Sequence, residues 1–235
     1  MKILLYDIEW EPATAYVWKM YDNNISPDQL IDPGGLLCFS AQWFGEKEVL
    51  FYSKWEHGRS GMVRALHSLM SEADAVITYN GDAYDNKKTM GEFLLEKLPP
   101  PPPITSIDLI KTVKKFGFIS NKLAVVGPYL GIGEKIKNGG FRLWVDVKNG
   151  DEKAQKTMKK YCIQDTKLLS TLYKAVRPYI KNHPHLGKTS GLSCGACGSR
   201  KLHSRGYYRT KMFKTQRVQC LSCGSWSTGK RTRHG

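Results

Sequence analysis

The chain has 235 residues, 41% of them hydrophobic and 24% charged, which suits a globular protein with one well-filled core and a small appendage. No run of 18 apolar residues occurs, which excludes a membrane-spanning helix, and Asp7 and Glu9 interrupt the apolar start before it could act as a signal peptide. We therefore expect a cytoplasmic protein, associated with the nucleoid or, if viral, with the host cytoplasm. There the six cysteines should be thiols or metal ligands rather than disulfides.

The positive charge is concentrated towards the C-terminus. The net charge is +15, and residues 181–235 contain twelve lysines and arginines but no acid. Such a segment cannot neutralise itself through internal ion pairs, so a polyanion, and nucleic acid first, is the expected partner. The alternative is a solvated basic tail. We expect no membrane contact, and the sequence does not define protein partners.

The pattern of apolar residues predicts an α/β fold that begins with strands. Strands are predicted at 2–7, 15–20, 36–44, 48–52, 75–79 and 104–109, where β-branched, aromatic and aliphatic residues cluster. Helices are predicted at 61–73, 85–98, 122–130 and 151–179, where apolar residues recur every three or four positions. Pro99 to Pro103 should form an extended spacer, and residues 131–140 form a Gly- and Lys-rich loop.

These patterns divide the chain into two domains. Residues 1–180 form the predicted α/β domain, and residues 181–191 have the composition of a linker. Residues 192–235 contain four cysteines and few aliphatic side chains, which indicates a small basic module.

Acidic side chains recur at three places in the α/β domain. Asp7 and Glu9 are two residues apart, so on a strand they project from the same face, which is costly unless a cation holds them. Alone, such a pair indicates a solvated strand end. However, the segment 80–85 lies between a predicted strand and a predicted helix, and Tyr161 and Asp165 lie one turn apart on the last helix.

Taken in order, these three sets resemble the DEDD superfamily of 3′–5′ exonucleases, in particular the proofreading domain of family B DNA polymerases. The matching positions are Asp7-Ile8-Glu9 for the first motif, Asn80 with Tyr84-Asp85 for the second, and Tyr161 with Asp165 for the third. The tyrosine four residues before the last aspartate is typical of the DEDDy branch. The resemblance covers about residues 1–175 and implies an α/β, ribonuclease H-like fold, with a mixed sheet flanked by helices. We expect no proofreading within the same chain, since no polymerase domain follows.

The resemblance also implies a catalytic centre with two Mg²⁺ or Mn²⁺ ions about 3.5–4 Å apart. Carboxylate oxygens are suitable ligands for such hard cations. Asp7 would bridge both ions, Glu9 and Asp165 would complete the site of the attacking water, and Asp85 would hold the second ion. Tyr161 would orient the water.

Residues beside these motifs have weaker assignments. Trp10 could stack on a terminal base, although a half-buried packing role is an equally good interpretation. Asp82 is expected to cap a turn, and Asp108 and Asp146 are expected at strand ends or in supporting roles. The expected nucleic-acid contacts are Trp10, Asn80, Tyr84, Arg205, Arg209, Lys211, Lys214 and Arg217.

The C-terminal module carries two Cys-x-x-Cys-Gly units. Their cysteines are Cys194, Cys197, Cys220 and Cys223, with 22 residues between the inner two. Four thiolates at this spacing predict one structural Zn²⁺ in a zinc ribbon, whose folding the metal should drive. The glycine after each second cysteine suits the positive φ of such a turn. The residues between the units should form a β-hairpin with a basic face. Cys38 and Cys162 have no partner at ligand spacing and are expected to pack in the core.

The expected function is therefore that of a metal-dependent 3′–5′ exonuclease acting on DNA, on single strands or 3′ ends, in repair or replication. The zinc ribbon would aid DNA binding. A structure-specific, resolvase-like DNA endonuclease, an RNA exonuclease and a non-catalytic DNA-binding adaptor remain as alternatives. Scattered acids, or a lysine that fills their pocket in place of a cation, would contradict a nuclease.

Overall fold

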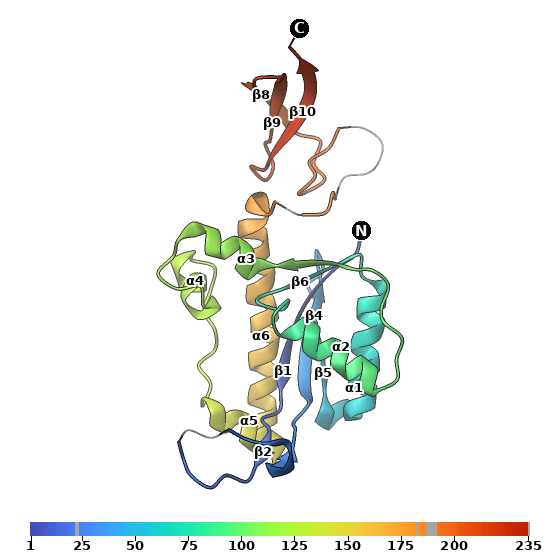
Figure 1. Ribbon diagram of the computed structural model, residues 1–235, viewed down its shortest axis with the longest axis vertical. Coiled ribbons are helices and arrows are strands. Elements are labelled where there is room, and N and C mark those ends of the chain that lie inside the picture. Colours follow the sequence, from blue (N-terminus) through green and yellow to red (C-terminus); the bar gives the residue numbers. More distant parts are fainter. Residues whose placement is uncertain (22–23, 182, 187–191, 235) are drawn as a thin grey trace. The chain divides into compact units, whose positions relative to one another are not determined.

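A computed structural model describes residues 1–21, 24–181, 183–186 and 192–234 (Figure 1). The chain divides into two compact units, residues 2–172 and residues 173–235, the latter with Met1. Part of the predicted linker at 181–191 lies outside the described residues.

A five-stranded mixed sheet forms the centre of the larger unit. Its strands, in spatial order, are β5 (Leu50–Ser53), β4 (Leu36–Trp43), β1 (Ile3–Trp10), β6 (Ala75–Thr78) and β7 (Thr105–Asp108). β1 pairs antiparallel with β4 and parallel with β6, while β4–β5 is antiparallel and β6–β7 is parallel. This arrangement confirms the ribonuclease H-like α/β fold that the motifs predicted.

Helices cover both faces of this sheet. They are α1 (Lys54–Glu72), α2 (Asp85–Leu95), α3 (Leu109–Val113), α4 (Leu123–Tyr129), α5 (Phe141–Lys148) and α6 (Glu152–Val176). Helices α1 and α2 pack on one face, and α5 and α6 pack on the other (Figure 1). Three short 3₁₀ turns and the two-stranded ribbon of β2 (Thr14–Ala15) and β3 (Leu30–Asp32) complete the regular structure of the described residues before 181.

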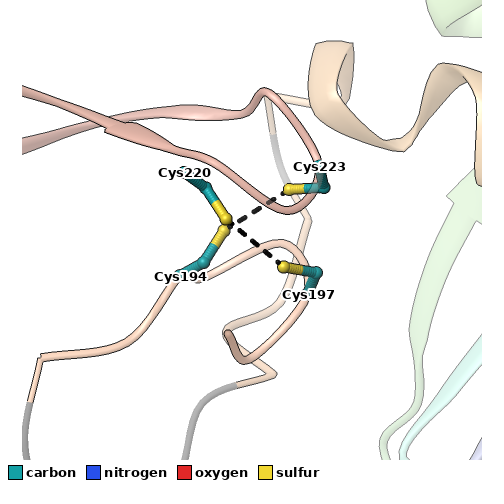
Figure 2. A group of neighbouring side chains, drawn as sticks. All are labelled: Cys194, Cys197, Cys220 and Cys223. Atoms are coloured by element: carbon teal, nitrogen blue, oxygen red, sulfur yellow. Dashed lines mark hydrogen bonds between the residues drawn. The ribbon is translucent and has the colours of Figure 1, made fainter. Parts of the chain in front are cut away.

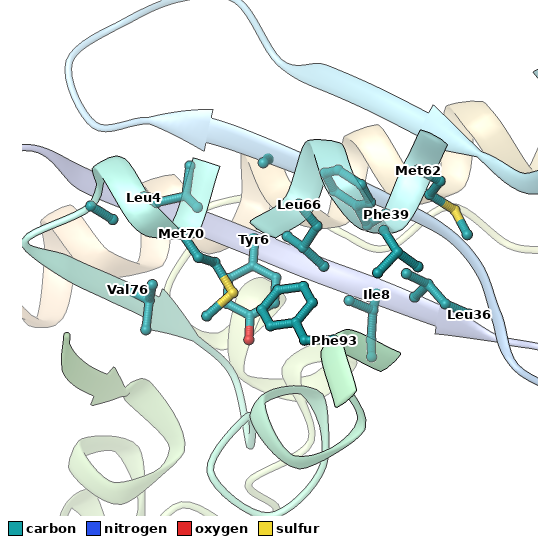
Figure 3. Packing of buried hydrophobic residues seen from close by; sticks show 13 residues of the cluster. Leu4, Tyr6, Ile8, Leu36, Phe39, Met62, Leu66, Met70, Val76 and Phe93 are labelled. Carbon is teal, nitrogen blue, oxygen red and sulfur yellow. The ribbon is translucent and has the colours of Figure 1, made fainter. Parts of the chain in front are cut away.

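The alternation of side chains along β1 determines what each face of the sheet receives. Leu4, Tyr6 and Ile8 pack with buried residues of α1 and with Phe93 of α2 (Figure 3). On the other face, the buried cluster consists of Leu37, Cys38, Leu143, Val147, Ala154, Met158, Tyr161 and Cys162. The predicted packing role of Cys38 and Cys162 is thereby confirmed, and the acids of β1 are left on the face that α6 covers.

One predicted strand is wrong. The segment at 15–20 was expected to be a strand, but β2 ends at Ala15. Beyond it the side chains are exposed, and Trp18 is 97% accessible. The apolar composition is real, but the strand pairing with the three-residue β3 ends at Ala15. Only the Tyr16 N–H, which donates to Gln29 O at 3.0 Å, extends the backbone contacts of the described segment towards that side.

Two helices also differ from the predictions. α1 begins at Lys54, seven residues before the predicted start, because the Ser53 side chain accepts a hydrogen bond from the Glu56 N–H and caps a short first segment. That segment joins the rest of α1 through a non-helical Gly58. α5 was not predicted, since eight residues with only Leu143 and Val147 buried give too short a periodic pattern.

The smaller unit contains a three-stranded antiparallel sheet in the order β10–β9–β8. Its strands are β8 (Leu202–Arg209), β9 (Phe213–Cys220) and β10 (Trp226–Arg233). The first two form the expected hairpin, whereas β10 was not expected because its Ser-Thr-Gly-Lys sequence lacks an apolar alternation. Among the described helices, none is both long enough and apolar enough to cross a bilayer.

Candidate active site and metal centres

Three carboxylates converge where β1 faces α6. Asp7 and Glu9 come from the strand and Asp165 comes from the helix, and one oxygen of each lies within 4.8 Å of the others. Glu9 and Asp165 are buried, and Asp7 is partly buried. The structure therefore brings together three of the four acids that the motifs selected.

Burial makes the negative charge of this cluster unfavourable. It raises the pKa of Asp7 well above its ordinary value, and repulsion from Glu9, Asp85 and Asp165 adds to the effect. Burial, followed by repulsion from Asp165, raises the pKa of Glu9 to about 8. At neutral pH, protonation of Asp7 and Glu9 or binding of a cation beside them is therefore favoured.

The chemistry of these groups fits a divalent cation. The site offers carboxylate oxygens, the preferred ligands of Mg²⁺ and Mn²⁺. Asp165 Oδ1 is buried and has no hydrogen-bond partner among the described residues. A buried acceptor without a donor is costly, and a metal ion would satisfy it.

Asp85 lies next to this cluster but not within it. It is the first residue of α2, is buried, and its Oδ1 accepts a hydrogen bond from the Ile8 N–H at 3.4 Å. Burial raises its pKa to about 6 even though backbone donors oppose the shift. Its charge acts on Asp7, but its oxygens are not among the three that converge.

Lys135 is a residue of the site that the sequence analysis did not select. It belongs to the loop 131–140, and its Nζ donates to Asp165 Oδ2 at 2.6 Å and to the Tyr161 hydroxyl at 3.3 Å. Burial would lower the pKa of Lys135, but the charge of Asp165 outweighs this and raises it.

A lysine that fills the acidic pocket would contradict a nuclease, but Lys135 does not fill it. Its direct ion pair is with Asp165 alone among the three acids. A cavity of about 500 Å³ remains, lined by Asp7, Asn80 and Lys135 among others. The pKa of Asp7 and that of Glu9 stay raised although the Lys135 charge opposes both shifts. The charge of Lys135 is therefore too small to offset the burial and repulsion that disfavour ionised Asp7 and Glu9.

Trp144 is a second contact that the sequence analysis missed. Its Nε1 donates to Glu9 Oε2 at 3.1 Å, and its ring meets the Tyr161 ring edge-on with centroids 5.8 Å apart. It thus fixes one oxygen of Glu9 and the position of Tyr161. Since α5 itself was not predicted, no sequence signal placed Trp144 near the acids.

The expected nucleic-acid contacts of this unit line two cavities. Asn80, which has a φ of 68°, lines the cavity next to Asp7, and its N–H donates to Asp108 Oδ1 at 2.7 Å. The second cavity, of about 560 Å³, is lined by Trp10, Glu11, Pro12, Ala13, Pro33, Tyr84, Lys88, Phe141 and Trp144. Trp10 also packs against the hydrophobic core that β1 shares with α1 and α2. The half-buried packing role of Trp10 fits this contact, whereas its stacking on a terminal base stays a prediction.

Three further acids are explained without a metal. Asp82 does not cap a turn: its carboxylate accepts hydrogen bonds from Asn86 and Ser106 and pairs with Lys111. Asp108 ends β7 and accepts the N–H groups of Asn80, Asp82 and Ile110, so it supports the turn that carries Asn80. Asp146 is not at a strand end, because it lies on α5 and pairs with Arg142 at 2.8 Å.

The four cysteines of the smaller unit form a second candidate metal centre. Their sulfurs all lie within 4.8 Å of one another, with Cys194–Cys223 at 3.7 Å and Cys197–Cys220 at 3.6 Å (Figure 2). A tetrahedron of Zn–S bonds of about 2.3 Å has edges of roughly 3.8 Å, close to both distances. The cluster is compatible with a zinc ribbon.

The two cysteine turns have matching backbone geometry. Gly198 N–H donates to Cys194 O at 2.8 Å and Gly224 N–H donates to Cys220 O at 2.9 Å. The φ angles of the two glycines are 73° and 77°, which confirms the predicted positive values. Apart from cysteines, Ala196 is the sole fully buried member of the cluster around them in the described module, so hydrophobic burial contributes little to its folding.

The expected basic contacts of this module lie on its hairpin. Arg205 and Arg209 belong to β8, Lys211 lies in the turn, and Lys214 and Arg217 belong to β9. All are exposed except Lys214, which is half-buried.

Comparison with known proteins identifies the class of this chain. Residues 32–177 match the model of the RNase_H superfamily, so the chain belongs to that superfamily and has an RNase H-like nuclease fold. The match begins after Asp7 and Glu9, which it therefore does not include. No curated protein matches the sequence.

Two solved structures are similar to this chain. One is the family B DNA polymerase from the hyperthermophilic archaeon Pyrobaculum calidifontis, with a TM-score of 0.58 and 16% identity, covering 75% of this chain and 24% of the polymerase. The other is Trypanosoma brucei RNase D, with a TM-score of 0.46 and 13% identity, covering 77% of this chain and 57% of that chain. At these identities the polymerase supports the fold alone.

Proposed function

We propose that the protein is a metal-dependent 3′–5′ exonuclease of the DEDDy type that hydrolyses phosphodiester bonds of DNA. The observation that carries the proposal is the convergence of Asp7, Glu9 and Asp165, whose oxygens lie within 4.8 Å of one another. Burial and mutual repulsion there disfavour the charged forms of Asp7 and Glu9. The order and spacing of the three motifs support the DEDDy assignment.

Two Mg²⁺ or Mn²⁺ ions would be held by Asp7, Glu9 and Asp165, with Asp85 beside them. When bound, such ions supply a hydroxide nucleophile and stabilise the leaving oxygen. Burial raises the pKa of Tyr161 above its ordinary value, so its hydroxyl acts as a hydrogen-bonding group that orients the attacking water rather than as a base.

The two cavities beside the acids would seat the end of the strand. Asn80 lies in the cavity that Asp7 lines, and Trp10 and Tyr84 present aromatic surface in the other. Stacking on such rings is tolerant of sequence, as an exonuclease requires. We place DNA before RNA because the motifs resemble those of polymerase proofreading domains.

The C-terminal module would bind one structural Zn²⁺ through Cys194, Cys197, Cys220 and Cys223. The sulfur spacing and the scarcity of other buried side chains support this assignment. Its basic sheet would hold nucleic acid for the exonuclease domain.

The test of the exonuclease proposal is the substitution Asp7→Asn, which keeps the shape of the side chain but removes its charge. We expect the wild-type protein with Mg²⁺ or Mn²⁺ to shorten a 5′-labelled single strand stepwise from its 3′ end. The variant should lose at least about a hundredfold in rate, as is common when a group acting on the transition state is removed, and should still bind DNA. Asp146→Asn is the matched control, because it removes an acid outside the cluster.

Parallel substrates separate the alternatives. If the protein shortens an RNA strand faster than the DNA strand, RNA is the substrate in place of DNA. Cleavage of a covalently closed circle would indicate an endonuclease. If the protein binds these substrates but hydrolyses none of them, the nuclease proposal is rejected and a non-catalytic adaptor remains.

A further inference from the structure

The sheet of the C-terminal module has two unlike faces. Residues paired directly across an antiparallel sheet share a face, and alternate residues along a strand do so too. The first face carries His203, Tyr208, Phe213, Thr215, Arg217, Gln219, Trp226, Thr228, Arg231 and Arg233. The second carries Leu202, Ser204, Tyr207, Arg209, Lys214, Gln216, Val218, Cys220, Ser227 and Thr232.

Arginines are concentrated on the first face, which we call the arginine face. Arg205 belongs to it as well, since its Nε donates to Gln219 Oε1 at 3.0 Å. Together with Arg217, Arg231 and Arg233, this gives four arginines and no lysine among the residues assigned to that face. Of the basic residues expected to contact nucleic acid, Arg209 and Lys214 lie on the opposite face.

An aromatic slot lies in the middle of the arginine face. Tyr208 and Trp226 come from the two outer strands, and Arg217 lies on the central strand between them. These three residues and Thr228 line a cavity of about 360 Å³, to which Ser227 of the opposite face also contributes. Tyr208 is 43% exposed and Trp226 is 55% exposed, so both rings keep accessible surface.

We propose that this slot binds an unpaired nucleobase, and that the arginine face is therefore a binding site for single-stranded nucleic acid. Aromatic rings stack on any base, but the face of a base is accessible only when it is not stacked in a duplex. Guanidinium groups bind phosphate oxygens in pairs and also stack on bases, so arginine suits this role better than lysine.

Charge favours nucleic acid over a protein as the occupant. Residues 181–235 contain no acid, so no side chain of the module competes with phosphates for these arginines. The inference rests on the proposed function only in taking nucleic acid as the ligand, and it does not depend on hydrolysis.

The experiment measures binding of the full-length protein to three probes without added Mg²⁺ or Mn²⁺. The probes are a single strand of about 12 nucleotides, the matching duplex, and an abasic strand with the same phosphates. We expect the wild-type protein to prefer the single strand with bases. Trp226→Ala and Tyr208→Ala should each weaken that binding about tenfold, while binding of the abasic strand changes less than about twofold.

Matched variants make the outcome specific to the slot. Tyr207→Ala removes an exposed tyrosine from the opposite face and should leave all three affinities within about twofold, whereas Trp226→Phe should restore most of the single-strand affinity. Zinc content shows whether each variant keeps its fold.

Two results would overturn the proposal. One is an equal loss for Tyr207→Ala and Trp226→Ala, and the other is an equal loss for the abasic and the base-containing strands. Either result would reject the slot as a nucleobase-binding site but would not bear on the exonuclease proposal. Conversely, failure of hydrolysis would leave these binding measurements interpretable.

Discussion

At the scale of single residues, Lys135 is the group whose effect on the acidic pocket is easiest to isolate. Its ammonium group touches both Asp165 and the Tyr161 hydroxyl. We expect Lys135→Met to slow hydrolysis by at least about tenfold, because Tyr161 loses the donor that fixes it and the pocket loses a positive charge near the phosphate. Titration with Mn²⁺ should show equal or tighter metal binding, because the variant lacks the ammonium group that repels Mn²⁺ in the acidic pocket.

The control for this substitution is Lys137→Met, which removes an exposed lysine of the same loop. Weaker Mn²⁺ binding by the Lys135 variant would show that Lys135 holds the carboxylates in place rather than acting on the substrate.

The same scale shows which site residues a sequence can predict. The alternation of a strand places Asp7 beside Glu9, and the turn of a helix places Tyr161 beside Asp165, because both relations are local. Lys135 and Trp144 reach the acids only through tertiary packing, from a loop and from a helix with a weak pattern. A lone lysine in a Gly- and Lys-rich segment carries no local signal for such a position.

At the scale of elements, α4 positions the loop that carries Lys135. The Ile132 N–H donates to Gly127 O at 3.1 Å, and a Cβ on Gly127 would lie 2.5 Å from Gly133 O. We therefore expect Gly127→Ala to push the loop away from α4 and to reduce hydrolysis at least about tenfold. Thermal unfolding should show a loss of about 1–3 kcal/mol, typical of overpacking.

Gly139→Ala is the matched control for this loop, because a Cβ at that position meets open space. Unchanged activity in the Gly127 variant would show that the loop position does not matter for catalysis.

Element predictions succeeded where burial and periodicity agreed. The predicted strands at 36–44 and 75–79 and the predicted helix at 122–130 correspond to β4, β6 and α4, each of which contributes buried apolar residues. The failures at 15–20 and at β10 have opposite causes. The segment at 15–20 is apolar but has too little neighbouring backbone to pair with. β10 is polar but forms a strand because it pairs with β9.

At the scale of the whole molecule, the sequence predicts the separation of charge. The converging acids lie in the unit 2–172, whereas the arginine face lies in the unit 173–235, which has twelve basic residues after position 180 and no acid there. Composition alone shows this asymmetry, because it needs no pairing of distant residues. The division of basic residues between the two faces of the sheet was not predictable, since it depends on two register shifts.

Charge within the acidic pocket should also make the stability of the whole protein depend on pH. Burial raises the pKa of Glu9 from 4.5 to about 8 and that of Asp85 from 3.8 to about 6. The folded state therefore holds protons that the unfolded state releases, so stability from these groups is complete below about pH 4 and is lost as pH rises through 8. Mn²⁺ should replace the lost protons.

We therefore expect thermal unfolding without chelator to show a larger stabilisation by Mn²⁺ at pH 8 than at pH 5.5. The difference should be on the order of 2 kcal/mol, or roughly 4–8 °C for a chain of this size. Asp7→Asn should remove most of the Mn²⁺ effect and, without metal, be more stable than the wild-type protein at pH 8, because one repelling carboxylate is gone. A Mn²⁺ effect that is equal at both pH values, or that survives in the variant, would place the cation elsewhere than among these carboxylates.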